Sequence, residues 1–269
     1  MAEFVSITST DDPRVAPYTA IRERDLTGRD GKFIVEGKVT LGILLARSRF
    51  KIESLFLAES RLEPLADLLA SVPDDVPIYT APQAIMDEIA GFNIHRGILA
   101  CARKGDPLEL ENITGPQTLL VLNQISNHDN VGAAFRNAAA FGAGGVVLDD
   151  QSCDPLYRKA IRVSAGASLW LPYTHGGTGK DQISALKTAG YTIWAMTPRA
   201  GVASLNEVGI PDKLAIVLGA EGTGLPDSLL DAALPVRIPM AADFDSVNVA
   251  TAGAIALAHV FQARRSGSS

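Results

Sequence analysis

The stretch Ile238-Pro-Met-Ala-Ala-Asp-Phe-Asp-Ser-Val-Asn-Val-Ala-Thr-Ala-Gly253 organises the C-terminal half of this chain. A short apolar run leads into a proline and a polar loop, and an alanine-rich segment follows. Ser246 is a natural N-cap for a helix beginning there, whereas Asn248 is a poorer helix former inside the first predicted turn. The stretch therefore predicts a strand, a polar loop and a helix, with polar side chains gathered at the turn.

Strands and helices alternate along the chain up to this stretch, which predicts an α/β fold. In the C-terminal half we expect strands at 118–122, 145–148, 191–195, 214–218 and 236–239, and helices at 131–141, 154–164, 181–188 and 246–262. In the N-terminal half we expect strands at 33–36, 52–58, 76–79 and 97–102, and helices at 39–46, 62–70 and 82–90. The Gly- and Pro-containing residues 106–117 predict a linker between domains 1–105 and 118–269.

Composition narrows the class of protein. With 47% hydrophobic residues the chain can bury a real core, and no apolar run approaches the ~18 residues of a membrane helix. The first ten residues lack the layout of a signal peptide. Cys101 and Cys153 stand apart from each other and from the four histidines, which argues against a zinc site or a disulfide framework. We therefore predict a cytoplasmic protein without membrane segments or metal.

The charge is unevenly distributed along the chain. The net charge of −6 is unusual for a sequence-blind nucleic-acid binder. Between Arg14 and Lys51, however, nine Lys and Arg residues stand against four acids. This local excess predicts either an anion-binding face or a solvated surface of mixed charge.

Two earlier segments carry polar residues that are candidates for a ligand-binding site. In the first, a polar loop follows strand 118–122 and leads into a helix that carries Asn130 and Arg136, the position at which open α/β sheets bind ligands. In the second, Glu221 stands among three glycines that let backbone approach a ligand closely. Folding alone could also explain them, with Asn130 or Asp129 as a helix cap and Glu221 as an exposed turn residue.

Taken together, the three segments resemble the motifs of the SpoU (TrmH-type) branch of the SPOUT RNA methyltransferases. The resemblance lies in Asn130-x-Gly-x-x-x-Arg136, in Leu218-Gly-x-Glu-Gly-x-Gly-Leu225, and in Ile238-Pro-Met240 followed by Ser246-x-Asn248. The N-terminal pattern, Phe33-Ile-Val-Glu-Gly37 and later His95-Arg-Gly-Ile-Leu-Ala100, resembles an L30e-like substrate-binding domain. The resemblance covers nearly the whole chain.

The resemblance implies an N-terminal L30e-like α/β domain and a C-terminal parallel-sheet domain whose last segment forms a trefoil knot. It also implies a homodimer that uses S-adenosylmethionine to methylate a ribose 2′-hydroxyl of RNA. Carried over to this chain, the catalytic group would be Asn130, Arg136, Glu221, Ser246 and Asn248. The cofactor would lie against Leu218, Gly219, Ile238, Met240, Val247 and Asn248.

For substrate we expect structured RNA, with ribosomal RNA favoured over transfer RNA because the L30e-like extension is similar to that of ribosomal-RNA members. Basic side chains on both domains would hold its phosphates, which positions RNA without reading sequence. These are Arg22, Arg24, Lys32, Lys38, Arg158 and Arg162. Two alternatives stay open, a non-catalytic RNA-binding scaffold of the same fold and a methyltransferase acting on a base nitrogen.

Overall fold

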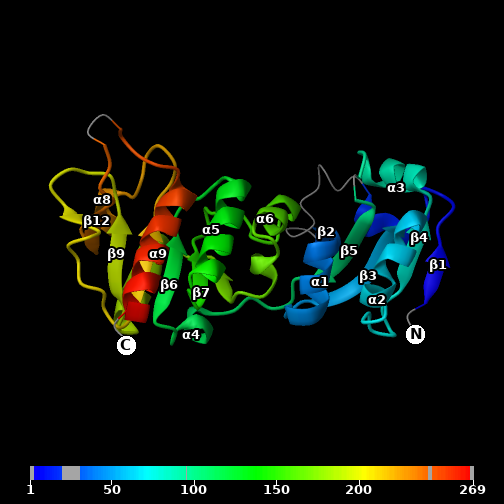
Figure 1. The fold of residues 1–269 in the computed structure, drawn as a ribbon, viewed down its shortest axis with the longest axis horizontal. Helices are drawn as coiled ribbons and strands as arrows, with labels where there is room; N and C mark the ends of the chain where they lie inside the picture. Colours follow the sequence, from blue (N-terminus) through cyan, green and yellow to red (C-terminus); the bar gives the residue numbers. More distant parts are fainter. Residues whose placement is uncertain (1–2, 20–30, 95, 242–243, 267–269) are drawn as a thin grey trace. The chain divides into compact units, whose positions relative to one another are not determined.

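The computed structural model describes residues 3–19, 31–94, 96–241 and 244–266, and it divides into two compact units (Figure 1). The first unit contains Met1–Asp106 together with Leu156–Trp170. The second contains Pro107–Pro155 and Leu171–Ser269. Residues 156–170, which the chain reaches only after entering the second unit, thus pack within the first.

The second unit is built on a seven-stranded sheet in which every pairing is parallel. Its order is β10-β12-β9-β11-β6-β7-β8. The strands are β6 (Thr118–Leu122), β7 (Gly145–Leu148), β8 (Tyr173–His175), β9 (Thr192–Met196), β10 (Ala203–Ser204), β11 (Leu214–Leu218) and β12 (Leu234–Arg237). The prediction of an α/β fold with a parallel sheet is confirmed. The short strands β8 and β10 were not expected.

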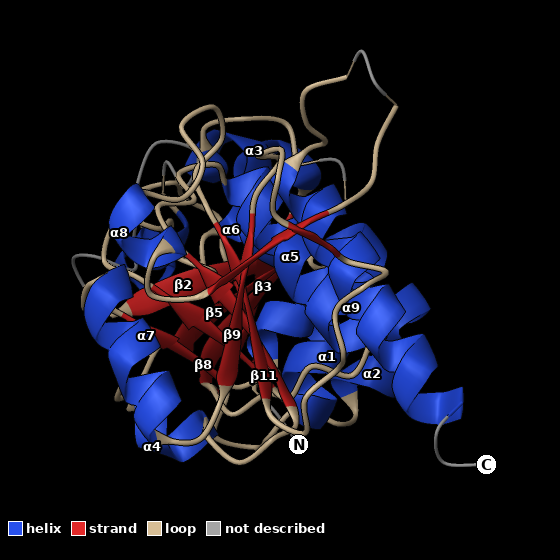
Figure 2. Ribbon diagram, turned by 90° about the vertical axis from the view of Figure 1, so that its left-hand side faces the viewer, coloured by secondary structure: helices blue, strands red, loops and turns tan. Residues whose placement is uncertain are grey.

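Helices cover both faces of this sheet (Figure 2). On one face lie α5 (His128–Ala140) and α9 (Val249–Ser266), and on the other lie α4 (Leu110–Ile113), α7 (Gly179–Thr188) and α8 (Asp227–Leu230). Alternate residues of the strands, such as Val121 and Val217, pack with Ile183 and Leu186 of α7 in one buried cluster. The central strands are buried along their whole length because helices cover both faces, which explains their nearly continuous apolar sequences.

The first unit has a five-stranded mixed sheet of order β1-β4-β3-β5-β2. Its strands are β1 (Phe4–Ser6), β2 (Lys32–Glu36), β3 (Lys51–Ala58), β4 (Ile78–Ala81) and β5 (Ile98–Arg103), and its helices are α1 (Lys38–Arg47), α2 (Ala66–Leu69) and α3 (Gln83–Ala90). The sequence pattern predicted one helix over 62–70. That segment is instead a 3-10 turn, Glu63–Leu65, followed by the single turn of α2. Pro64 has no N–H to donate to a helical ladder and so favours this break.

Residues 156–170 complete the first unit. Helix α6 (Arg158–Val163) packs against β2, and the Arg158 guanidinium pairs with Glu36 while lying 4.8 Å from the ring centre of Phe92. Further along, the Arg47 guanidinium of α1 lies 4.0 Å from the ring centre of Trp170. These are one charge-assisted contact and two cation–π contacts. The segment is therefore tied to the first unit through both its ends.

None of the described helices is long and apolar enough to cross a bilayer. Within the same residues, no group of three His, Cys, Asp or Glu side chains is placed to hold a metal ion. The expectation that no metal is used stays a prediction.

Candidate functional site

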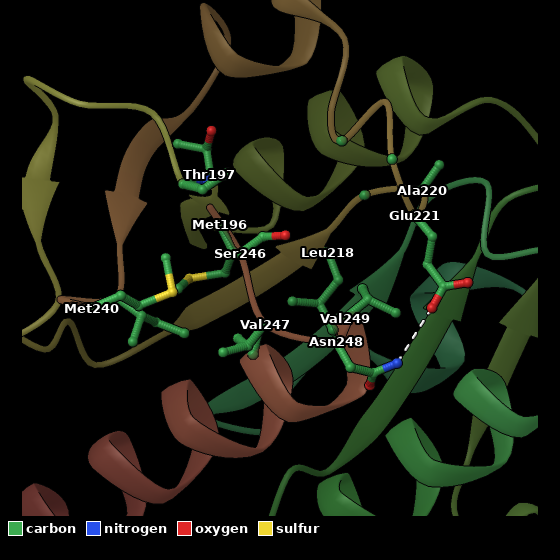
Figure 3. A pocket seen from close by; sticks show the side chains of 16 residues that line it. Met196, Thr197, Leu218, Ala220, Glu221, Met240, Ser246, Val247, Asn248 and Val249 are labelled. Atoms are coloured by element: carbon green, nitrogen blue, oxygen red, sulfur yellow. Dashed lines mark hydrogen bonds between the residues drawn. The ribbon is translucent and has the colours of Figure 1, made fainter. Parts of the chain in front are cut away.

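A cavity of about 310 Å³ opens at the carboxyl ends of β9, β11 and β12, three neighbouring strands of the parallel sheet (Figure 3). Parallel α/β sheets bind their ligands at this edge, because the loops that follow the strands meet there. The cavity is lined by Met196, Thr197, Pro198, Leu218, Gly219, Ala220, Glu221, Gly222, Gly224, Ile238, Met240, Ser246, Val247, Asn248, Val249 and Ala252.

Gly219 shapes the wall that follows β11. A Cβ at this position would lie 2.5 Å from the carbonyl carbon of Gly224 and 2.5 Å from the nitrogen of Leu225, closer than real Cβ contacts. The chain folds back here so tightly that the Gly224 N–H donates to the Ala220 carbonyl at 3.0 Å. A side chain at 219 would force this turn apart, which explains why the sequence has glycine at that point.

Three polar side chains from distant parts of the chain meet beside the cavity. The Asn248 Nδ2 donates to Asn130 Oδ1 at 2.9 Å and to Glu221 Oε1 at 3.2 Å, the second bond being drawn in Figure 3. The Asn130 Nδ2 also donates to the same Glu221 oxygen. The three predicted motifs therefore converge in one hydrogen-bonded cluster, in which two amides hold a single carboxylate.

Asn248 also caps helix α9. Its Oδ1 accepts hydrogen bonds from the N–H groups of Ala250 at 2.9 Å and Thr251 at 3.2 Å. The sequence pattern placed the cap at Ser246 and the helix start beside it, and this was wrong: α9 begins at Val249. Residues 246–248 are not helical and form part of the cavity wall, where Ser246 is exposed.

The cap is supported from α5. Asn137 lies seven residues after Asn130, on the same side of that helix, and its Nδ2 donates to the carbonyl of Ala250 at 2.9 Å. Asn130 and Asn137, which lie about two turns apart on α5, thus both contact the start of α9. Neither contact depends on a flexible charged side chain.

The predicted site residues differ in where they lie. All six predicted cofactor contacts line the cavity, as do Glu221 and Ser246, and Asn130 is joined to the cavity through its hydrogen bonds. Arg136 lies on the exposed side of α5 and does not line the cavity. Among the described residues it has no hydrogen-bond or ion-pair partner, so its guanidinium is available to an external anion.

The predicted RNA contacts fall into three groups. Arg22 and Arg24 lie outside the described residues. Lys32 is engaged by Glu53 at 3.0 Å, and Arg158 is engaged by Glu36, as noted above. Lys38 and Arg162 are exposed, so they present charge to solvent.

Several cavity residues were not predicted. Met196, Thr197 and Pro198 enter from the end of β9, while Val249 and Ala252 enter from the first turns of α9. The signal for the first group was present, because any residue directly after a central parallel strand faces the ligand-binding edge. The second group depends on where α9 begins, and the sequence pattern predicts that start three residues too early.

The fold and site define an α/β protein with a cavity at the ligand-binding edge of its parallel sheet, lined by three separated segments within 196–198, 218–224 and 238–252. The model of the SpoU rRNA Methylase family matches residues 117–258, more than half of the chain. This chain belongs to that family, and its class is therefore that of the RNA methyltransferases.

Known proteins agree with this assignment over the full length. A relative from Mycobacterium bovis, an uncharacterized tRNA/rRNA methyltransferase, is 36% identical and is aligned over 97% of this chain and 92% of its own. An AdoMet-bound rRNA methyltransferase from Sinorhizobium meliloti shares the fold with a TM-score of 0.82 at 22% identity, covering 97% of this chain and 98% of that one. An RNA 2′-O ribose methyltransferase has a TM-score of 0.80 at 25% identity, covering 97% and 100%.

Proposed function

We propose that this protein transfers a methyl group from S-adenosylmethionine to a ribose 2′-hydroxyl in structured RNA. The observation that carries the proposal is the convergence of Asn130, Glu221 and Asn248 beside one cavity at the ligand-binding edge of the sheet. The RNA 2′-O ribose methyltransferase that is 25% identical over 97% of this chain supports the choice of the ribose. The AdoMet-bound rRNA methyltransferase that shares this fold supports the choice of cofactor.

The cavity fits S-adenosylmethionine in size and chemistry. Its volume of about 310 Å³ lies in the range of small-molecule sites, roughly 300–1,000 Å³. Leu218, Ile238, Met240 and Val247 offer apolar surface to an adenosyl group, and Gly219 presents backbone without a side chain at the cavity wall. When bound, the cofactor supplies an electrophilic methyl group on a sulfonium. These residues would hold it, together with the Asn248 end of α9.

Arg136 is the residue we propose to act on the RNA. A guanidinium surrenders a proton very reluctantly, so a role as general base is chemically poor. Its planar donors instead suit an adjacent RNA phosphate and the negative charge that develops on the 2′-oxygen. Its exposure and lack of a partner among the described residues support this role.

The other polar residues are proposed to orient the reacting groups. Ser246 places an exposed hydroxyl on the cavity wall, where it can orient the ribose hydroxyl. Asn130 and Asn248 fix the Glu221 carboxylate, and Glu221 in turn fixes the geometry of the loop after β11. Holding reactants in line contributes much of the rate enhancement in such transfers.

The experiment incubates the full-length protein with methyl-labelled S-adenosylmethionine and with unmodified ribosomal and transfer RNA transcribed in vitro. We expect label in RNA, and alkaline hydrolysis should leave the labelled nucleotide in an alkali-resistant dinucleotide, because a 2′-O-methyl group blocks cleavage. Label in alkali-labile mononucleotides would instead support base-nitrogen methylation. Absence of cofactor binding in a calorimetric titration would support the non-catalytic scaffold.

We propose that ribosomal RNA is preferred over transfer RNA and that the first unit is an L30e-like domain that helps to hold it. Lys38 and Arg162 both belong to that unit and are the exposed side chains among the predicted RNA contacts that the structure describes. Lys32 already pairs with Glu53 and Arg158 with Glu36, so each would have to divide its hydrogen bonds between that carboxylate and an RNA phosphate. Comparing initial rates on the two RNA classes at equal concentration tests the preference.

A homodimer and a C-terminal trefoil knot complete the proposal. The knot would involve the residues after β12, which run along the cavity before α9 packs against α5 and β11. Light scattering coupled to gel filtration should give twice the mass of one chain. A crystal structure traced through residues 238–248 would decide whether the chain passes through the loop that follows β9.

A further inference from the structure

Gln124 lies two residues after the end of β6 and adopts a left-handed backbone conformation, with φ of 59°. Among the described residues other than glycine, only Gln124 and Ala165 have positive φ. This conformation is costly for a residue with a Cβ, and glycine adopts it without penalty. Non-glycine residues held in such conformations concentrate at functional sites, where the surrounding contacts impose the geometry.

A buried polar network imposes the geometry at Gln124. The carboxylate of Asp149, 2% exposed, accepts from the Gln124 N–H at 3.0 Å, from Asn123 Nδ2 at 2.9 Å and from the Ser152 hydroxyl at 2.7 Å. The Ser152 oxygen in turn accepts from the N–H of Ile125 at 3.0 Å. A buried carboxylate with this many donors is rigidly placed, because moving it would leave polar groups unsatisfied.

The neighbours of Gln124 have structural roles, whereas its own side chain has none. Ile125 is buried in the core and the Asn123 amide is bound to Asp149. The Gln124 side chain is exposed, and its carboxamide makes no hydrogen bond with any residue the structure describes. The network thus fixes the backbone from which the exposed Gln124 side chain extends, and its amide is left free to hydrogen-bond an external group.

Gln124 also lies next to the cavity along the sheet edge. The N–H of Asn123 donates to the carbonyl of Leu218 at 2.9 Å, and Leu218 lines the cavity. Strands β6 and β11 are paired in the sheet, so the loops that follow them share the same edge. Six residues beyond Gln124, in the first turn of α5, lies Asn130 of the polar cluster.

From this arrangement we infer that Gln124 is a specificity-determining residue that hydrogen-bonds a nucleobase edge of the RNA held at the cavity. An amide offers a donor and an acceptor side by side, which suits the Watson–Crick edge of an unpaired base. The inference rests on the proposed RNA methyltransferase function and adds to it a contact that selects the nucleotide. A residue needed only for the turn would be served better by glycine.

The test compares full-length Gln124→Gly and Gln124→Asn with the wild type. Glycine removes the amide and relieves the backbone, whereas asparagine tolerates the left-handed conformation and keeps an amide one methylene shorter. Ala165→Gly, at the other non-glycine left-handed position, controls for relief of the backbone alone. Melting temperature, S-adenosylmethionine affinity and kinetics on unmodified in-vitro-transcribed ribosomal RNA are measured for each.

We expect Gln124→Gly to melt at or above the wild-type temperature and to bind S-adenosylmethionine equally well. Its kcat/KM for RNA should fall about tenfold, the usual scale for one lost recognition hydrogen bond, with partial recovery in Gln124→Asn. Wild-type kinetics in Gln124→Gly, or a lower melting temperature with weakened cofactor binding, would overturn the inference and leave the methyltransferase proposal intact. If the wild type methylates no RNA, the proposed function fails, and this inference fails with it.

Discussion

Asn248 combines a structural role and a site role in one side chain, and substitutions can separate them. Replacing it with alanine removes two capping bonds to Ala250 and Thr251 and two donor bonds to Asn130 and Glu221. Replacing it with serine keeps an oxygen that can accept from the helix N–H groups but removes the amide donor. The two variants therefore share the same damage to the polar cluster and differ in the cap.

The structure sets the expected magnitudes. Loss of an N-cap costs about 1 kcal/mol, and the bonds to Asn130 and Glu221 contribute roughly another 1 kcal/mol because Asn248 and Glu221 are exposed. Asn248→Ala should therefore lose about 2 kcal/mol of unfolding free energy and Asn248→Ser about 1 kcal/mol. For a domain of this size these losses correspond to falls in Tm of roughly 4–8 °C and 2–4 °C.

Both variants should weaken S-adenosylmethionine binding to the same extent, by about tenfold, since the Glu221 loop loses its support in each. Thermal melts followed by circular dichroism give the stability difference, and isothermal titration calorimetry gives the Kd. The reasoning is refuted if Asn248→Ser binds the cofactor like the wild type. It is equally refuted if both variants melt at one temperature, because the cap would then contribute nothing.

Three further outcomes are expected. Arg136→Lys keeps the charge but loses the planar fork, so turnover should fall at least a hundredfold, roughly the contribution of one stabilising group, while the calorimetric Kd for S-adenosylmethionine stays unchanged; near-normal turnover would contradict the role. Replacing Arg264 with alanine should lower the free energy of unfolding by about 2–4 kcal/mol in chemical denaturation. Its guanidinium donates to the carbonyls of Pro211 at 2.9 Å and Asp212 at 3.1 Å and to Thr118 Oγ1 at 2.8 Å, and the variant loses all three bonds. Burial raises the pKa of the Cys101 thiol from 9.0 to about 12, so the unfolded thiol ionises first and stability should decline between those pH values; denaturation titrations of Cys101→Ala should show a flatter alkaline limb.

The parts of the fold that could be predicted are those where one physical requirement dominates. Strands β6, β7 and β11 begin and end where the sequence pattern placed them, because central parallel strands must be apolar throughout. Strand β8 escaped prediction because its three residues, Tyr173–His175, carry little hydrophobic signal. Residues 156–170 were assigned by chain order to the second domain, and no local pattern reveals that they pack within the first unit.

For the site, the local sequence patterns indicate separate candidate residues but do not show that these residues lie together in the fold. Glu221 alone was compatible with an exposed turn, and Asn130 with a helix cap, until Asn248 was found to hydrogen-bond both. The resemblance to a family groups these residues into one site, which the periodicity of the sequence cannot do. The start of α9 was placed too early because Ser246 satisfies the usual capping preference, whereas the chain first has to form the cavity wall.

The membership of residues 156–170 in the first unit bears on the order in which the protein folds during synthesis. A ribosome releases the N-terminal residues first. Glu36 can pair with Arg158, and Arg47 can contact Trp170, only after the chain has grown past residue 170. The first unit therefore cannot reach its complete form as a nascent N-terminal fragment. A polypeptide ending at residue 106 should show weaker amide-hydrogen protection in β2 and α1 than the full-length protein, and equal protection would show that the late segment is dispensable.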